Sequence, residues 1–172
     1  MTRASWAIRP KGERDAAGVA ALLAEISREG RWVATEWPFD VEERARQMRD
    51  GLLRRWCVGW VATDARDLVG DLTVFDIDRD EPELGMVVAA THRRRGIGRA
   101  LLACAIEWAQ ANGKPALTLR VFPDNDPARE LYRASGFVDV EVQRGAIPRR
   151  SGPALDAVLM RRATAPRLDS AG

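Results

Sequence analysis

The stretch THRRRGIGRALL, Thr91 to Leu102, sets three consecutive arginines beside two glycines, just before an apolar helical pattern. Glycines at such a junction let the backbone approach a ligand closely, and the first turn of a helix carries N–H groups without internal partners. No Ser, Thr, Asp or Asn stands near Gly96 to cap that helix. The stretch therefore predicts an anion site at the start of a helix, and a phosphate group would suit it.

Two other interpretations of this stretch stay open: a tight turn with solvated basic side chains, and a contact to nucleic acid. The net charge is only +2, from 27 basic and 25 acidic residues, so we expect neither a nucleic-acid partner nor a membrane surface. Two phosphate-binding fingerprints are excluded by reading. The chain has no GxxxxGK[ST], and GIGRAL has leucine where GxGxxG ends in glycine.

The length of 172 residues suits one core and is short for two ordinary domains. We expect one domain over residues 1–162 and a flexible, weakly hydrophobic tail over 163–172. Cys57 and Cys104 lack CxxC spacing and His92 is the single histidine, so neither a metal site nor a disulfide framework is expected. With no signal-peptide run and no membrane-length segment, we expect a soluble, cytoplasmic protein.

Hydrophobic periodicity outward from the loop predicts the order strand, two helices, three strands, helix, strand, helix and two strands. This order indicates an α/β or α+β domain around one mixed sheet. The predicted strands cover 4–9, 55–63, 68–77, 83–89, 116–122, 137–142 and 154–160. The predicted helices cover 13–28, 41–53 and 127–135, with a further one that follows Gly96 and ends at Gly113.

Two of these helices carry candidate N-caps. Asp40 is expected to cap the helix over 41–53, with Glu43 three residues later in the manner of a capping box. Asp126 is expected to cap the helix over 127–135, because proline in the first turn and glycine after the last turn suit its two ends.

The form RxxGxG, made by Arg93, Gly96 and Gly98 between a strand and an amphipathic helix, resembles motif A of the GNAT superfamily of acetyl-CoA-dependent N-acetyltransferases. LTLRVFPDNDPARELYRASGF, Leu117 to Phe137, is similar to the strand, Asn, Ala, Leu-Tyr and Gly-Phe segment of that family. The likeness covers roughly 68–160 and is closest in appearance to small-molecule members. It implies a single GNAT-like domain with a mixed, mostly antiparallel sheet of about seven strands and four flanking helices.

The resemblance also implies a cofactor site. The anion would be the pyrophosphate of acetyl-CoA, which would act as co-substrate without a metal. The edge of the strand before the loop would pair with the pantetheine arm, as an added strand does. The residues that it assigns to the cofactor are Met86, Val87, Val88, Arg93, Arg94, Arg95, Gly96, Ile97, Gly98, Arg99 and Asn125.

Two residues are candidates for proton transfer. Tyr132 occupies the Leu-Tyr position of the family, where its hydroxyl would protonate the departing thiolate, although its helical stripe also fits a core residue. An acceptor amine with a pKa of about 10.4 is almost fully protonated at neutral pH, so a proton must leave before or during attack. Glu83 would take it, directly or through water, unless it is a solvated residue at a hairpin end. A chain of waters or Glu36 remains open.

The acceptor site is expected in GRWVATEWPFD, Gly30 to Asp40, where Trp32, Trp37 and Phe39 surround Glu36. Aromatic rings and a carboxylate suit an apolar ligand with a positive amine, while packing between a helix and a hairpin is the alternative. We therefore expect direct transfer of acetyl to a primary amine of a small molecule, such as an amino acid or a polyamine. Protein or peptide acetylation and a non-catalytic acyl-CoA sensor stay open, as does a homodimer.

Overall fold

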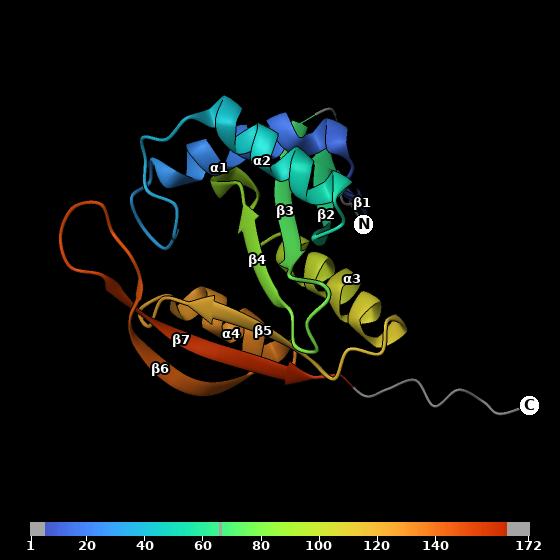
Figure 1. The fold of residues 1–172 in the computed structure, drawn as a ribbon, viewed down its shortest axis with the longest axis vertical. Helices are drawn as coiled ribbons and strands as arrows, with labels where there is room; N and C mark the ends of the chain where they lie inside the picture. Colours follow the sequence, from blue (N-terminus) through green and yellow to red (C-terminus); the bar gives the residue numbers. More distant parts are fainter. Residues whose placement is uncertain (1–5, 66, 165–172) are drawn as a thin grey trace, which may run out of the picture.

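The computed structural model describes residues 6–65 and 67–164, which form one seven-stranded sheet and four α-helices (Figure 1). The strands are β1 (Trp6–Pro10), β2 (Cys57–Asp64), β3 (Asp67–Phe75), β4 (Glu83–Val88), β5 (Ala116–Val121), β6 (Val138–Ile147) and β7 (Leu155–Ala163). The helices are α1 (Ala16–Ser27), α2 (Val41–Leu53), α3 (Ile97–Ala111) and α4 (Asp126–Ala134), with 3₁₀ turns at Glu13–Asp15 and Ala90–His92. The predicted order of strands and helices is confirmed.

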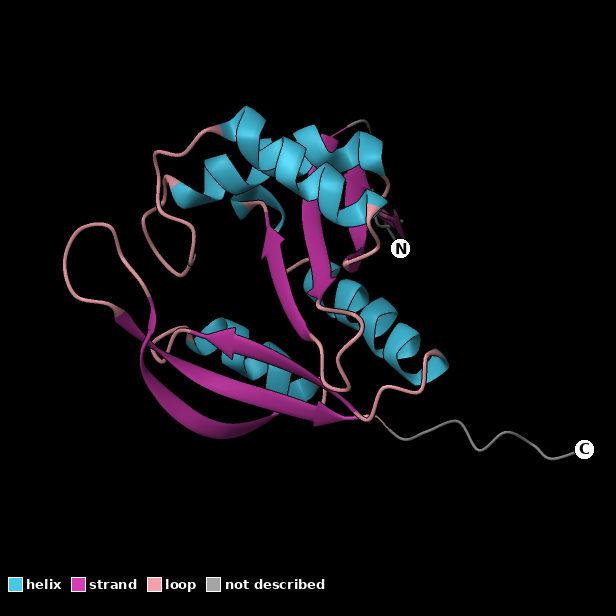
Figure 2. Ribbon diagram, viewed as in Figure 1, coloured by secondary structure: helices cyan, strands magenta, loops and turns pink. Residues whose placement is uncertain are grey.

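The sheet has the order β1-β2-β3-β4-β5-β7-β6, and every neighbouring pair is antiparallel except β4 and β5. This confirms the predicted mixed, mostly antiparallel sheet. Figure 2 shows α1 and α2 together over one face of the first half of the sheet, with α3 across the other face. The remaining helix, α4, lies against the half made by β5, β7 and β6.

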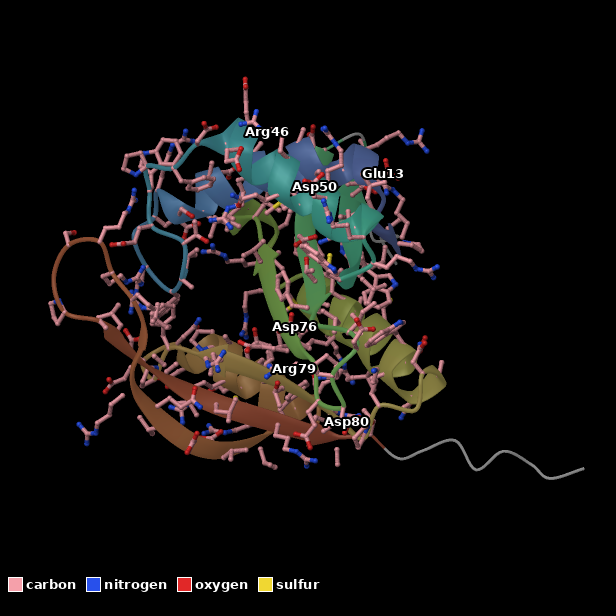
Figure 3. All side chains as sticks on the ribbon, in the orientation of Figure 1. Glu13, Arg46, Asp50, Asp76, Arg79 and Asp80 are labelled. Carbon is pink, nitrogen blue, oxygen red and sulfur yellow. The ribbon has the colours of Figure 1, made fainter. Side chains whose placement is uncertain are left out.

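The main core fills the space between the sheet and α3 and α4. Leu72, Leu101, Leu117, Phe137 and Met160 are almost completely buried there. Charged side chains gather instead on the outer side of α2, where Figure 3 shows Arg46 and Asp50. No helix within the described ranges combines the length and the apolar character that crossing a bilayer requires.

The strands β4 and β5 separate soon after they begin. Within these two strands, which the structure describes completely, the single residue pair is Glu83 with Thr118. Pro82 extends the contact, because its carbonyl accepts a hydrogen bond from the Thr118 N–H at 3.1 Å. Beyond this point the two strands diverge, as Figure 1 shows, and the β4 edge from Met86 to Val88 faces the gap rather than a neighbouring strand.

The helix ends follow the predicted capping with two corrections. Asp40 Oδ1 accepts a hydrogen bond from the Glu43 N–H at 2.9 Å, but the Glu43 carboxylate binds Arg46 and Gln47 and does not close a capping box. The cap of α4 is Asn125, not Asp126, so that prediction was wrong by one residue. Its Oδ1 accepts from the N–H three residues later, while Asp126 already has a place in the first turn.

The predicted boundaries shift at several elements. The helix expected over 13–28 divides into a 3₁₀ turn and α1, and the strand expected over 137–142 continues to Ile147. Ala163 ends β7, and the hydroxyl of Thr164 donates to the Lys114 carbonyl. The remainder of the predicted tail, 165–172, and the first residues of the first predicted strand lie outside the described residues.

Candidate functional site

The two glycines of GIG have different structural roles at the start of α3. Gly96 is the N-cap with a φ of 87°, in the left-handed region that glycine adopts readily, and no side chain caps the helix there. A Cβ on Gly98 would lie 3.0 Å from Leu131 Cδ2 and 3.3 Å from Met86 Cε. Gly98 therefore lets α3 pack closely against α4 and β4, while Gly96 turns the chain into the helix, whose first N–H groups have no side-chain cap.

The arginines of this loop also differ in their contacts. Arg93 binds the Glu29 carboxylate through two hydrogen bonds of 2.9 and 2.7 Å and donates to the Val88 carbonyl at 3.2 Å. Its side chain therefore ties the loop to β4 and to the residues that follow α1. No ion pair or hydrogen bond inside the described part of the chain holds the exposed Arg94 and Arg99 side chains. They are the guanidinium groups of the loop that an anion at the helix start could recruit.

A cavity of about 780 Å³ opens where β4 and β5 diverge. It reaches from this gap across the sheet face beneath α1 and α2. The predicted cofactor and catalytic residues that line it are Glu83, Met86, Val87, Val88, Asn125 and Tyr132. One continuous space therefore joins the open β4 edge to the two candidate proton-transfer residues.

Tyr132 belongs to the core and also lines the cavity. Only 7% of the residue is exposed, its ring packs edge-on against Phe137 with centroids 6.0 Å apart, and it belongs to the core cluster. It also lines the cavity. Burial raises the pKa of the Tyr132 hydroxyl to about 12, so the phenol keeps its proton at neutral pH. A neutral hydroxyl beside the cavity can donate a proton.

Asn125 also serves two purposes. Its Oδ1 caps α4 by accepting from the Ala128 N–H at 3.3 Å, and the residue lines the cavity. The side-chain oxygen accepts the capping hydrogen bond, and the side-chain NH₂ group can donate to a ligand.

Glu83 is held by a partner that sequence reasoning missed. Its Oε2 accepts a hydrogen bond of 2.5 Å from Arg120 Nη1 on β5. The Arg120 Nε donates in turn to Gln143 Oε1 on β6 at 2.7 Å. Both Glu83 and Arg120 line the cavity. The parallel pairing of β4 and β5 creates this ion pair, and no local pattern in the sequence indicates it.

Only one of the four predicted acceptor residues lines the cavity. Trp32 lines the cavity together with the three residues that follow it, whereas Glu36, Trp37 and Phe39 are absent from the lining. The Glu36 carboxylate accepts from the Arg150 N–H at 2.6 Å, and the Arg150 guanidinium donates to the Glu36 carbonyl at 2.9 Å.

The two remaining aromatic rings pack on the protein itself. Arg28 lies over the Trp37 ring at 4.0 Å, and the Trp37 and Phe39 rings meet edge-on at 5.7 Å. Nearby protein groups therefore engage the Glu36 carboxylate and part of the Trp37 and Phe39 rings, while 38% of Trp37 stays exposed. Trp32 is different, since its buried Nε1–H has no hydrogen-bond partner among the described residues.

A buried polar cluster on the cavity floor also escaped the sequence reasoning. Lys11, Asp71 and Thr73 all line the cavity, and Lys11 Nζ lies 2.7 Å from Asp71 Oδ1. The sequence signal for this cluster was the presence of two polar residues, Asp71 and Thr73, within the apolar run of β3, LVGDLTVF. Their partner Lys11 lies 60 residues earlier in the chain.

Comparison with known proteins gives the family. Residues 21–137, more than half of the chain, match the family described as Acetyltransferase (GNAT) family. The chain belongs to the GNAT family. The resemblance of the arginine and glycine loop and of the Leu-Tyr segment to this family is therefore confirmed.

Two curated relatives show how this GNAT protein compares with characterised members. It is 27% identical to the L-methionine sulfoximine/L-methionine sulfone acetyltransferase of Pseudomonas paraeruginosa over 91% of this chain and 93% of that one. It is 33% identical to the [Ribosomal protein bS18]-alanine N-acetyltransferase of Escherichia coli over 53% of this chain. The match spans 64% of the Escherichia coli protein, less than two thirds of its length.

Solved structures agree with the GNAT fold. A GNAT acetyltransferase from Streptococcus pneumoniae superimposes with a TM-score of 0.79 at 25% identity, covering 93% of this chain and 99% of that chain. A putative acetyltransferase from Salmonella typhimurium, solved with its cofactor acetyl-CoA, has a TM-score of 0.79 at 19% identity and covers 93% and 94%. The second likeness concerns the fold alone.

Proposed function

We propose that this GNAT protein is an N-acetyltransferase that moves an acetyl group from acetyl-CoA directly to a primary amine of a small molecule. One observation carries the proposal. The divergence of β4 and β5 opens the edge from Met86 to Val88 into a cavity of about 780 Å³ that Asn125 and Tyr132 also line. An open strand edge that leads from an anion-binding helix start into a cavity suits a long, amide-bearing thioester.

The cofactor would lie along this path. Its pyrophosphate would accept hydrogen bonds from the backbone of 94–99, and the exposed Arg94 and Arg99 would supply charge. The side chain of Arg93, held by Glu29, would stabilise the loop rather than bind the phosphate. The pantetheine amides would pair with β4 at 86–88, and the Asn125 NH₂ group would donate to the arm.

Starting from an ammonium, two protons leave the nitrogen, one before the attack and one after the C–N bond forms, and one proton reaches sulfur. The amine nitrogen attacks the thioester carbonyl, the C–N bond forms, and the C–S bond breaks. The Tyr132 hydroxyl, which is neutral at physiological pH, protonates the departing thiolate. The Glu83 carboxylate, oriented by Arg120, takes through water the proton that leaves before the attack, and the proton lost after the attack replaces the one that Tyr132 gives to sulfur.

A small acceptor fits the contact between two loops at the cavity. Arg149 donates to the carbonyls of Val33 and Ala34 at 3.1 Å, which joins the loop after α1 to the loop between β6 and β7. The Pseudomonas paraeruginosa relative acts on L-methionine sulfoximine and aligns over nearly its whole length, which also supports a small acceptor.

Peptide acetylation is the second candidate, because the Escherichia coli relative acts on a ribosomal protein. A thiol-release assay with acetyl-CoA and a panel of amino acids, polyamines and peptides tests both. Turnover of the small amines supports the proposal, turnover restricted to peptides supports the second candidate, and acetyl-CoA binding without any turnover contradicts both and leaves an acyl-CoA sensor.

A further inference from the structure

Three polar side chains form a closed network on the floor of the cavity. Lys11 Nζ donates to Asp71 Oδ1 at 2.7 Å and also to Thr73 Oγ1, while the Thr73 hydroxyl donates to Asp71 Oδ2 at 3.1 Å. The Lys11 and Asp71 side chains are only 5% and 9% exposed. All three residues line the cavity, and the proton transfers proposed above do not use them.

A glycine makes this network possible. Lys11 follows β1, and its N–H donates to the Gly59 carbonyl on β2 at 2.8 Å. A Cβ on Gly59 would lie 2.7 Å from Lys11 Cε and 2.9 Å from Nζ, so the lysine side chain passes over the bare backbone of β2 to reach β3. Gly59 and Gly85 are the register partners of Thr73 on either side, which leaves this part of the sheet face without neighbouring side chains.

The network lies next to the proposed reaction point. Asp71 is the register partner of Val87, within the β4 segment proposed to pair with the pantetheine arm. Directly opposite residues of an antiparallel pair have Cβ atoms about 5 Å apart. An amine that enters the cavity to meet the thioester therefore passes beside Lys11 and Asp71.

The pair keeps hydrogen-bonding capacity that the protein does not use. An ammonium has three N–H donors, of which Lys11 gives two to Asp71 and Thr73, and a carboxylate has about four acceptor sites, of which Asp71 uses two. Removing two charges from water is unfavourable, and replacing a buried ion pair by apolar residues is often neutral or stabilising. A buried pair with spare donors and acceptors that faces a cavity suits a charged ligand.

We infer that Lys11 and Asp71 bind the α-carboxylate and the α-ammonium of a free amino acid, which is the acceptor class of this enzyme. The opposite charges of the pair are 2.7 Å apart, and the nitrogen and the nearer carboxylate oxygen of an α-amino acid are separated by about 3 Å. A zwitterion can therefore place each charge against its opposite, while an amine without a carboxylate engages only Asp71. The inference rests on the proposed function and selects one class from the small amines.

Other parts of the cavity lining suit an uncharged side chain. Trp32, Met48 and Leu52 line the same cavity and present ring, thioether and alkyl surfaces. Apolar amino acids are therefore the appropriate probes, each compared with the amine that lacks its carboxylate. L-Phenylalanine with phenethylamine and L-leucine with isoamylamine are two such pairs.

The experiment compares the two lysines of the chain. The wild type, Lys11→Met and Lys114→Met are assayed by thiol release with both acceptor pairs, and acceptor binding is measured by calorimetry in the presence of CoA. Lys114 is the matched control, because its exposed Nζ donates to the Arg79 carbonyl and the residue is not part of the cavity lining. If Lys11→Met unfolds because the buried Asp71 carboxylate has lost its partner, the double variant Lys11→Met with Asp71→Asn removes both charges together.

The expected result is a preference of the wild type and of Lys114→Met for the amino acid over its amine by about 10- to 100-fold in kcat/KM. Lys11→Met, or the double variant, loses that preference through the KM of the amino acid, with the KM of acetyl-CoA unchanged. Equal turnover of amine and amino acid by the wild type, or a preference that survives in the variant, overturns the inference.

The two proposals fail separately. If the wild type binds acetyl-CoA but acetylates no amine of any kind, the proposed function fails, while amino acid binding that Lys11→Met abolishes still supports this site. If the wild type acetylates polyamines or peptides and calorimetry detects no binding of L-phenylalanine or L-leucine, the site inference alone is overturned.

Discussion

The Arg120 guanidinium lies 2.5 Å from the Glu83 carboxylate and joins β5 to β4 at the point where the two strands part. Glu83 also forms, with Thr118, the single residue pair between these two strands. The residue at which the gap begins is therefore also the proposed proton acceptor. The side chain is held in place by the geometry that opens the cavity. This relationship makes Glu83 the first residue to test.

Glu83→Gln should lower kcat by about 100-fold or more, the usual range for loss of a general base, while the KM of acetyl-CoA stays near its wild-type value. The measurement is steady-state thiol release with a saturating amine. Glu81→Gln is the matched control, since the Glu81 carboxylate binds Arg161 and the residue does not line the cavity. Full activity of Glu83→Gln would remove this residue from the mechanism.

Tyr132→Phe should bind acetyl-CoA normally, and its kcat should be lower than that of the wild type by about 100-fold or more, because the variant lacks the hydroxyl proton that the thiolate receives. With the Tyr132 pKa raised to about 12 by burial, the wild-type rate should show no fall between about pH 8 and pH 10, where an ordinary phenol near 10 begins to ionise. The pH profile of kcat checks this. An alkaline fall near pH 9 that persists in Tyr132→Phe would point to another group.

Gly96→Ala tests the turn that presents the start of α3. Space is available for the methyl group, whose nearest neighbour would be a Trp6 ring atom at 3.8 Å, so the φ of 87° is the source of strain. A left-handed alanine costs about 1–2 kcal/mol, which should lower stability in urea unfolding and weaken CoA binding in calorimetry.

Gly113→Ala is the control for that variant. Gly113 also has a positive φ, 64°, and its added methyl group would meet no atom of another described segment within 4 Å, but it follows the other end of α3. It should lose a similar amount of stability and keep its affinity for CoA. If both variants lose CoA affinity equally, the start of α3 is not the anion site.

Arg149→Met tests the wall on the acceptor side. Without the hydrogen bonds to the Val33 and Ala34 carbonyls, the loop after α1 should move, and the KM of the acceptor should rise by about tenfold. The KM of acetyl-CoA should change little. Arg144→Met, on the exposed part of β6, provides the comparison; the wall is not part of the acceptor site if the two variants have the same acceptor KM.

Asp15 should make stability depend on acid pH. The hydrogen bonds from Arg9 lower the pKa of the Asp15 carboxyl below its unfolded value, so its contribution is present above about pH 4 and is lost as the pH falls through the folded pKa. Asp15→Asn should therefore be about 1 kcal/mol less stable than the wild type at neutral pH. Urea unfolding at a series of pH values should show that the difference narrows in acid; a constant difference would contradict this account.

Local patterns in the sequence were sufficient for the element order and the family. The alternation of β5 and the apolar stripe of α3 each arise from residues close in the chain, and so does the loop from Arg93 to Gly98. The capping of α2 by Asp40 is equally local. The cap of α4 is a local feature that the prediction missed by one residue, because Asn125 rather than the expected Asp126 holds the cap position in the backbone.

The acceptor side could be predicted only in part. Trp32 reaches the cavity, but Arg150 engages Glu36 from 114 residues away, and Trp37 packs under Arg28. The sequence places these aromatic and acidic residues in one loop. It does not reveal that partners from another loop and from the end of α1 occupy their polar and aromatic surfaces, because those partners arrive only when the chain folds.

The sequence by itself determined the family, the mixed sheet and the loop at the start of α3, since glycine conformation and hydrophobic periodicity are properties of consecutive residues. Only the tertiary structure decided which charges meet. Strand register and parallel pairing bring Glu83 to Arg120, and a side chain crossing over Gly59 brings Lys11 to Asp71. Ion pairs act over a few ångströms between residues far apart in the chain, so their partners are set by packing rather than by local sequence.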